Sequence, residues 1–299
     1  MARNKHPAPA AATVASVRYF NRGQPNLGID AFSLSSLLAR VPRDTLAGPQ
    51  RLDFHLLILC LAGCGAHCID FKLYDWTAGA VLHVRPGQVQ QFDLQADMEA
   101  LFILFTPAFL SAELGGMLLG RYQGVAGSRV QLDMGTDSHR RISDTFVAIA
   151  EEYRAIDASP VSARLLHHQL HALLLQLHRL SEATASRVIP DAMHLVYYRF
   201  LEDLERRFMQ TRQVESYAAH LGCSAKTLGR ACIGAAGVAP KRLIEQHVVL
   251  EAKRLLAHTQ IGIKGIAREL GFSEETNFVK FFKRMEGVPP SAFRAKFRL

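Results

Sequence analysis

The sequence predicts an α+β protein with a β-rich first half and an all-α C-terminal domain. Three observations support this class: short β-forming runs between residues 50 and 106, helical periodicity from Asp137 onward, and an internal repeat after residue 213. The chain has 299 residues, 49% of them hydrophobic, and is long enough for two domains that each bury a core.

Composition suggests where the domains begin and end. Residues 1–20 are predicted to be a disordered tail, because their short Ala stretch is broken by Pro and too weak for a signal-peptide core. Residues 21–180 are predicted to form the first domain, 181–190 a linker and 191–299 the second domain. No apolar run approaches the ~20 residues of a transmembrane helix, so we expect a cytoplasmic protein with no membrane partner.

The β-rich region contains several short strands separated by Gly and Pro. Arg51 to Cys60 and Ala66 to Tyr74 are β-forming runs, and the Gly-containing turn between them predicts that they pair as a hairpin. Three further strands are predicted at residues 81–84, 88–94 and 100–105. Short strands punctuated in this way predict an antiparallel barrel or sandwich.

Two helices are predicted after the strands, one from Asp137 to about Ala155 and one from Pro160 to about Leu180. One broad face of the second helix carries leucines, namely Leu165, Leu166, Leu170, Leu173, Leu177 and Leu180. Such a face needs a partner, which is either the strands or the same helix of a second subunit. We expect it to form the contact of a homodimer, because exposed apolar surface is unfavourable in water.

The C-terminal part of the chain contains the repeat. Val214, Tyr217, Ala218, Leu221 and Gly222 recur 49 positions later as Ile263, Ile266, Ala267, Leu270 and Gly271. Gly237-Val238-x-Pro240 recurs 50 positions later as Gly287-Val288-x-Pro290. Each copy predicts a short helix, a Gly turn and a second helix, which is the helix-turn-helix arrangement whose second helix enters the DNA major groove.

Each copy has a predicted cap and a predicted core pair. Ser224 is the expected cap of a helix over residues 225–235, with Leu228 and Cys232 facing the core. Ser273 is the expected cap of a helix over residues 274–285, with Phe278 and Phe282 as its core pair. A connecting helix over residues 241–258 would span roughly 27 Å, which approaches the ~34 Å between successive major grooves on one face of DNA.

The distribution of charge supports a nucleic-acid partner. Residues 191–299 hold 18 Lys and Arg against 11 Asp and Glu, which places a net charge of +7 there out of +8 for the chain. A local excess of this kind is typical of a phosphate-binding domain. The alternative, a basic half that only keeps the protein soluble, does not explain why the repeat occupies the same segment.

The C-terminal motifs resemble those of the AraC/XylS family of bacterial transcription regulators. The similar segments are Gly271-Phe272-Ser273, Asn277 to Arg284 and Gly287 to Arg294, with weaker similarity to the family's cupin-like effector domain at Phe54 to Leu57, Gly63-x-Gly65-x-His67 and Arg85 to Gln88. The resemblance implies a sequence-specific DNA-binding regulator. It implies two helix-turn-helix units joined by a long helix, a cupin-like antiparallel β-barrel that senses a small-molecule effector, dimerisation helices, and RNA polymerase as a partner.

The resemblance also implies which positions touch DNA. The family's base-contacting positions correspond to Lys226, Gly229 and Arg230, and to Glu275, Thr276, Asn277, Val279 and Lys280; Ser224, Lys283 and Arg284 complete the predicted set. Arg230 and Lys280 suit guanine edges, and Glu275 suits a cytosine amino group. Gly229 has no side chain to contribute and Cys232 stands where a large aromatic is usual, so the first unit is expected to read fewer bases.

The N-terminal domain is expected to bind a ligand rather than to catalyse. A cupin-type metal site needs clustered His and a carboxylate, whereas His55, His67 and His83 fall on separate predicted strands. We therefore predict no catalytic residue, metal or cofactor. The candidate effector-binding residues are His55, Trp76, Arg85, Gln88 and Gln90, with Arg51 beside them. A cupin-fold enzyme fused to a DNA-binding module remains the main alternative.

Two further clusters leave a thiol- or metal-responsive regulator open. Cys60, Cys64 and Cys68 lie close together in the sequence, and in the predicted hairpin Cys60 and Cys68 would be nearly opposite. Free Cys is more often a small buried hydrophobe. His167, His171 and His178 share one helical stripe, which we interpret as a solvated flank because no Cys or acidic residue accompanies them.

Overall fold

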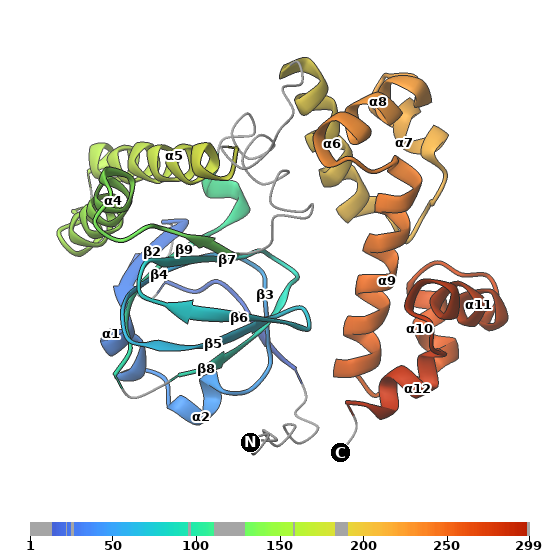
Figure 1. Cartoon of the computed structure of the whole chain (residues 1–299), viewed down its shortest axis with the longest axis horizontal. Coiled ribbons are helices and arrows are strands. Elements are labelled where there is room, and N and C mark those ends of the chain that lie inside the picture. The colour runs from blue at the N-terminus through green and yellow to red at the C-terminus, as the bar shows by residue number, and fades with distance from the viewer. Residues whose placement is uncertain are drawn as a thin grey trace. The chain divides into compact units, whose positions relative to one another are not determined.

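The computed structural model describes residues 14–297 apart from residues 22, 25–26, 95–96, 111–128, 158 and 183–190. The chain divides into two compact units, of which one comprises residues 15–188 and the other contains residues 189–299. The fold is α+β: the N-terminal unit contains sheets, and the described residues of the C-terminal unit form helices (Figure 1). No described helix has the length and apolar character needed to cross a membrane.

The strands of the N-terminal unit form two five-stranded sheets. Sheet A has the order β1-β3-β8-β5-β6, and sheet B has the order β10-β7-β4-β9-β2. The strands are β1 Ala15–Val17, β2 Ile29–Ser33, β3 Gln50–Leu52, β4 His55–Ala62, β5 Cys64–Ile69, β6 Lys72–Thr77, β7 Ala80–Val84, β8 Val89–Asp93, β9 Glu99–Phe105 and β10 Arg129–Gln131. The sheets are separate and share a core, so they form a sandwich. This is one of the two forms that the strand pattern predicts, and it differs from the barrel that the family resemblance implies.

The hairpin predicted between residues 51–60 and 66–74 is wrong. β4 lies between β7 and β9 in sheet B, whereas β5 pairs with β6 and β8 in sheet A. The second predicted run is interrupted by a turn at Asp70 and Phe71, which both have positive φ. The three later strands are confirmed as β7, β8 and β9.

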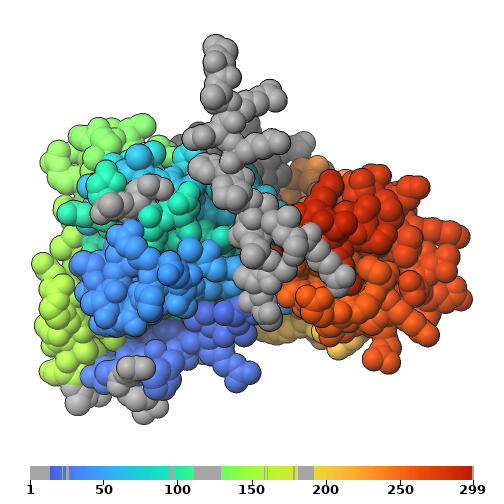
Figure 2. Space-filling view, turned by 90° about the horizontal axis from the view of Figure 1, so that it is seen from below, coloured from blue at the N-terminus to red at the C-terminus, as the bar shows by residue number. Residues whose placement is uncertain are grey.

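Sheet B has an apolar core on each of its faces. Side chains alternate along β4, so Leu56 and Ile58 pack against sheet A, whereas Leu57 and Leu59 pack beneath the helices α4 (Asp137–Arg154) and α5 (Pro160–Glu182). Figure 2 shows these two helices, in green and yellow-green, along one flank of the strands. The short helices of this unit are α1 Leu34–Leu38, α2 Arg43–Leu46 and the 3-10 turn η1 Pro107–Phe109.

The leucine face of α5 packs into the core of its own unit. Its buried members are Leu166, Leu170, Leu173, Leu174 and Leu177, which lie in the layer between the helices and sheet B. The prediction that this face joins two subunits is therefore wrong, because the strands already cover it. Leu165 and Leu175 lie on the opposite, exposed side of the same helix.

The C-terminal unit is organised around one long helix (Figure 1). Its helices are α6 Asp191–Arg207, α7 Val214–His220, α8 Ala225–Ala236, α9 Pro240–His258, α10 Ile263–Glu269, α11 Glu275–Glu286 and α12 Pro290–Ala295. α9 contacts α6 and α8 as well as α10, α11 and α12. Its far end is held by Arg294 of α12, whose guanidinium donates to the carbonyl oxygens of Leu256 and Ile261 at 3.2 and 2.6 Å.

Candidate nucleic-acid interface and ligand region

The first helix pair, α7 and α8, has the predicted local structure. Gly222 in the turn has a φ of +67°, a conformation that favours glycine. The Ser224 hydroxyl accepts a hydrogen bond from the Thr227 backbone N–H at 3.0 Å, which confirms it as the cap of α8. Leu228 and Cys232 are fully buried, so the opposite side of α8 is left facing solvent.

The second helix pair, α10 and α11, repeats this plan with a different start. The cap residue of α11 is Glu274 and its side chain makes no capping bond, so the predicted cap at Ser273 is wrong. Phe278 and Phe282 are fully buried as predicted. Phe282 also packs on Phe293 of α12, with ring centroids 5.5 Å apart, and aromatic contacts of this kind make the second pair a well-defined core.

The predicted DNA-contacting side chains form one exposed face on each pair. In the first pair Ser224, Lys226 and Arg230 are exposed; in the second, Glu275, Thr276, Asn277, Lys280, Lys283 and Arg284 are exposed. Arg284 differs from the others, because it already forms an ion pair with Glu245 of α9 at 2.8 Å. Exposed polar and basic side chains at the start and middle of a second helix suit contacts in a major groove.

Contacts that no local sequence pattern predicts join the two helix pairs. Arg212, in the loop before α7, lies over the ring of Phe272 with its guanidinium carbon 3.5 Å from the centroid, and it donates to the Leu270 carbonyl at 2.8 Å. Gly271 has a φ of +75°, and a Cβ at this position would lie 2.0 Å from the Met209 carbonyl oxygen. The loop before the first pair is thus packed against the turn of the second, across 58 residues of sequence.

The predicted effector residues do not gather in one place. His55 shares the face of β4 that carries Leu57 and Leu59, and it stacks on Phe105 with centroids 4.8 Å apart. Its Nδ1 lies 3.1 Å from Nε2 of His83, and both rings are buried. Burial lowers the pKa of His55 to about 3. This pair therefore belongs to the layer beneath the helices, rather than to the layer between the sheets.

The layer between the sheets holds a different group. Trp76 and Gln90 are buried there with His67, which packs edge-on against Phe92 at 4.4 Å between centroids. Both ring nitrogens of His67, Nε1 of Trp76 and Oε1 of Gln90 have no hydrogen-bond partner among the described residues. Burial lowers the pKa of His67 to about 3, so its ring is neutral. Hydrogen bonding to the Gln90 side chain raises the pKa of His67 against the effect of burial, so these two groups lie close enough to satisfy each other. Buried polar atoms are nearly always satisfied in folded proteins, and the indole N–H of Trp76 is the group here that requires a partner.

Two of the predicted effector residues are engaged in the turn between β7 and β8. Gln88 accepts a hydrogen bond from the Arg85 backbone N–H at 2.8 Å and donates to the Asp70 carboxylate at 2.7 Å. Arg51 donates to the Gly87 carbonyl at 3.0 Å. These bonds secure the turn and leave Gln88 little capacity for a ligand.

Cys60 and Cys68 lie in different sheets. Cys60 is opposite Ala100 in sheet B, whereas Cys68 is opposite Leu73 and Gln91 in sheet A, so the predicted juxtaposition of Cys60 and Cys68 is wrong. Burial raises the pKa of the Cys60 thiol to about 11 and also raises that of Cys68. Both thiols are therefore held in the less reactive protonated form.

Comparisons with known proteins place these features in context. A family profile described as a helix-turn-helix domain matches residues 217–296. The transcriptional activator RhaR of Escherichia coli is 23% identical over 264 residues, covering 85% of this chain and 89% of that protein. The activator RhaS of Escherichia coli is 26% identical over 257 residues, covering 81% of this chain and 85% of that protein.

Solved structures give similar matches. ToxT from Vibrio cholerae O395 aligns over 90% of this chain and 97% of its own, with 12% identity and a TM-score of 0.40. The DNA-binding domain of AdpA, solved in complex with a target DNA, aligns over 34% of this chain and 91% of its own, with 27% identity and a TM-score of 0.32.

Proposed function

This chain belongs to the AraC/XylS family of transcription regulators, and we propose that it contacts DNA through both helix pairs while its N-terminal unit binds a small-molecule effector. The observation that carries the first part is the recurrence of one exposed, polar helix face on α8 and again on α11. Both pairs pack on α9, so the two faces are held in a fixed relation. RNA polymerase is the further partner that the family membership suggests.

Within this proposal the exposed residues have separable roles. Arg230 and Lys280 reach guanine edges, and Glu275 accepts from a cytosine amino group. Thr276 and Asn277 lie in the first turn of α11, close to the groove floor, while Lys283 lies near its end and suits a phosphate. Arg284 must break its ion pair with Glu245 before it can reach the DNA backbone. Its contribution to the free energy of DNA binding is therefore reduced by the loss of that ion pair.

The test begins with selection of bound DNA from a random pool by the full chain. Arg230→Ala and Lys280→Ala should then each weaken binding to the selected site by about 1–3 kcal/mol and relax the preference at one base position. Arg154→Ala, which removes the same charge from an exposed position on α4, is the control and should leave binding unchanged. Equal losses on selected and random DNA would show that Arg230 and Lys280 touch only phosphate.

We propose that the effector site lies between the sheets, beside His67, Trp76 and Gln90. The indole N–H of Trp76 needs an acceptor, which favours a ligand that carries a hydrogen-bond acceptor. The neutral His67 ring and the surrounding aromatic side chains favour an uncharged ligand. The relatives that match most of this chain are transcriptional activators, which favours a sensor over an enzyme.

Trp76 is the single tryptophan of the chain, so its fluorescence can report ligand binding in this layer. Candidate metabolites that shift its emission should lose their effect in His67→Phe and Gln90→Leu variants that remain folded. His55→Phe is the matched control, because His55 lies on the other face of sheet B. Loss of the response in the His55 variant alone would move the site to the layer beneath the helices.

We propose that a homodimer forms through the outer face of α5, and not through its leucine face. Val161, Leu165, Ala172 and Leu175 are exposed and spaced along one stripe, with exposed fractions of 70, 42 and 41% for Val161, Leu165 and Leu175. Their spacing follows a heptad pattern, which is typical of a helix that pairs with another helix. Leu165→Glu with Leu175→Glu should give a folded monomer by sedimentation, whereas Val147→Glu on α4 should not. A monomeric wild-type chain, or a dimer that survives the double change, would refute this interface.

A further inference from the structure

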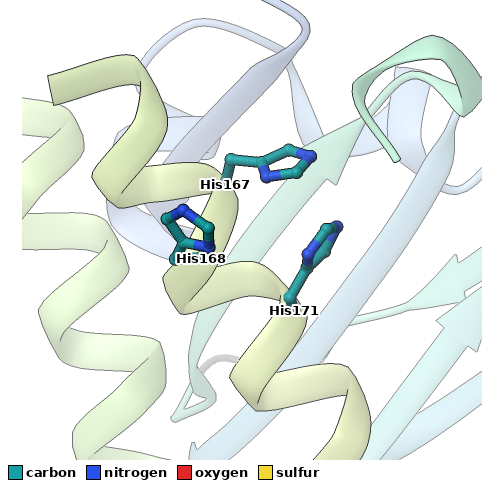
Figure 3. Close-up of side chains that lie close together, drawn as sticks. All are labelled: His167, His168 and His171. Carbon is teal, nitrogen blue, oxygen red and sulfur yellow. The ribbon is translucent and has the colours of Figure 1, made fainter. Parts of the chain in front are cut away.

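Three histidines of α5 lie close together, and none of them belongs to the residue groups described above (Figure 3). The ligand atoms of His167, His168 and His171 all fall within 4.8 Å of one another. At about 100° per residue, His171 falls between His167 and His168 around the helix axis, so one face presents all three rings. The predicted stripe comprises His167, His171 and His178, and its interpretation as a solvated flank is wrong for His171, which is buried. The side chain of His178 lies outside the part of the chain that the structure describes.

The surroundings of the rings leave their lone pairs available. Nε2 of His171 is buried and has no hydrogen-bond partner among the described residues. The ring centroids of His167 and His171 are 3.9 Å apart. The backbone carbonyl of Phe109 accepts a hydrogen bond from the His167 ring, and the Phe109 ring packs against it edge-on at 5.5 Å. A histidine oriented through one nitrogen by a backbone carbonyl presents its other nitrogen in a fixed direction, as metal-binding histidines do.

The protonation state of the cluster is also suited to coordination. Burial lowers the pKa of both His167 and His171, and the neighbouring histidines lower it further. The two rings are therefore neutral near pH 7, which is the form that binds a metal ion.

We propose that His167, His168 and His171 form a binding site for one divalent transition-metal ion of the zinc, nickel or copper class. Three imidazole nitrogens suit these ions, whereas magnesium and calcium require oxygen ligands. Bonds of about 2.0 Å to a tetrahedral ion place its donor atoms about 3.3 Å apart. The exposed side chain of His168 can rotate to close that distance, and the fourth position is left to solvent. This site is separate from the effector and DNA contacts proposed above. His168 does lie on the α5 stripe proposed for the dimer, so the titrations are repeated with the Leu165→Glu/Leu175→Glu variant, in which that stripe is exposed.

The test uses the purified full chain, titrated with Co²⁺ and followed by its visible absorption, and with Zn²⁺ by calorimetry. We expect one ion per chain. His168→Ala should weaken binding by about 10-fold or more, since a lost ligand costs at least as much as a lost supporting contact, and the double variant with His167→Ala should abolish it. His139→Ala, a partly exposed histidine on α4, is the control and should bind as the wild type does.

His168 is the decisive position because its side chain is exposed and its replacement does not disturb the core. Circular dichroism checks that each variant is folded. Unchanged affinity in His168→Ala would overturn the proposal, as would the absence of stoichiometric binding. A near-ultraviolet charge-transfer band from thiolate to cobalt would also overturn it, because the ion would then be bound by cysteine.

Discussion

The contact between Gly271 and the loop before α7 predicts that two equivalent glycines of the repeat differ in their tolerance of alanine. Gly222 and Gly271 occupy the same place in the two helix pairs, and both have positive φ, +67° and +75°. A Cβ at Gly222 meets nothing within 4 Å, whereas a Cβ at Gly271 would lie 2.0 Å from the Met209 carbonyl oxygen. The pair therefore separates the cost of backbone conformation from the cost of a clash.

The magnitudes follow from these two contributions. The left-handed conformation costs an alanine about 1–2 kcal/mol, partly offset by about 0.4–1 kcal/mol because alanine restricts the unfolded chain. Gly222→Ala should therefore lower the free energy of unfolding by about 1 kcal/mol. Gly271→Ala carries the same cost and must also displace a backbone oxygen that cannot rotate away, which adds about 1–3 kcal/mol. We expect a total loss of about 2–4 kcal/mol at Gly271.

Urea denaturation of the full chain measures both variants against an internal reference. Trp76 is the single tryptophan and lies in the N-terminal unit, so its fluorescence should follow the same transition in all three proteins. The unfolding of the C-terminal unit, followed by far-ultraviolet circular dichroism, should have its midpoint at a lower urea concentration in both variants. For Gly271→Ala the midpoint should fall by about 1 M or more, since the free energy of unfolding typically changes by about 1–3 kcal/mol per M of urea. If Gly222→Ala and Gly271→Ala lowered the free energy of unfolding equally, the prediction would be wrong, since the packing of Met209 would then contribute nothing.

Three further predictions concern the stability of the two units. Acidification from pH 7 to 5 should lower the free energy of unfolding of the N-terminal unit by about 2 kcal/mol for each of His55 and His67. The pKa of each ring is about 3 in the folded state, below the ordinary 6.5, so the unfolded state takes up protons that the folded state does not. The loss of stability therefore grows as the pH falls from 6.5 toward 3. If urea unfolding followed by Trp76 fluorescence gave the same free energy at pH 7 and pH 5, this prediction would be wrong. Leu173→Ala should cost about 2–5 kcal/mol in thermal or urea unfolding, against less than about 0.5 kcal/mol for Val147→Ala at an exposed position of α4. Similar losses for the two variants would contradict the burial of Leu173. Arg212→Ala should destabilise the C-terminal unit by about 1–3 kcal/mol, because it removes the contacts with the Phe272 ring and the Leu270 carbonyl. Arg212→Lys should recover only part of this loss, because an ammonium group cannot stack on a ring as a planar guanidinium does. Full recovery of stability by lysine would argue against stacking.

The helices of the C-terminal half were predictable because helix formation depends on residues that are close together in the sequence. The 3.6-residue period identifies Leu228, Phe278 and Phe282 as buried from the sequence alone, and Arg230 and Lys280 as exposed. The cap of α11 was not predictable in the same way, because Ser273 and Glu274 both precede the helix and the choice depends on backbone angles. The Arg212 contact joins positions far apart in sequence, and no local pattern predicts it.

The β half was only partly predictable because strand pairing is not local. A run from Ala66 to Tyr74 looks continuous in composition, yet Asp70 and Phe71 turn with positive φ that non-glycine residues seldom adopt. Once β4 and β5 belong to different sheets, alternation places His55 and Trp76 in different layers. The residue types proposed for a ligand were reasonable, but the layer that each one faces depends on which sheet its strand joins.

The sharing of α9 by both helix pairs has a consequence for phasing along the double helix. A chain with a flexible connector could adjust to operators of many spacings, whereas α9 fixes the angle and separation of the two exposed faces. One residue inserted within α9 would turn the second face by about 100° and advance it by about 1.5 Å, so that only one face at a time could meet the duplex. The length of α9 thus sets the distance between the two DNA segments that the exposed faces contact. The operators that the protein binds should therefore share one spacing between these segments, close to a single turn of DNA.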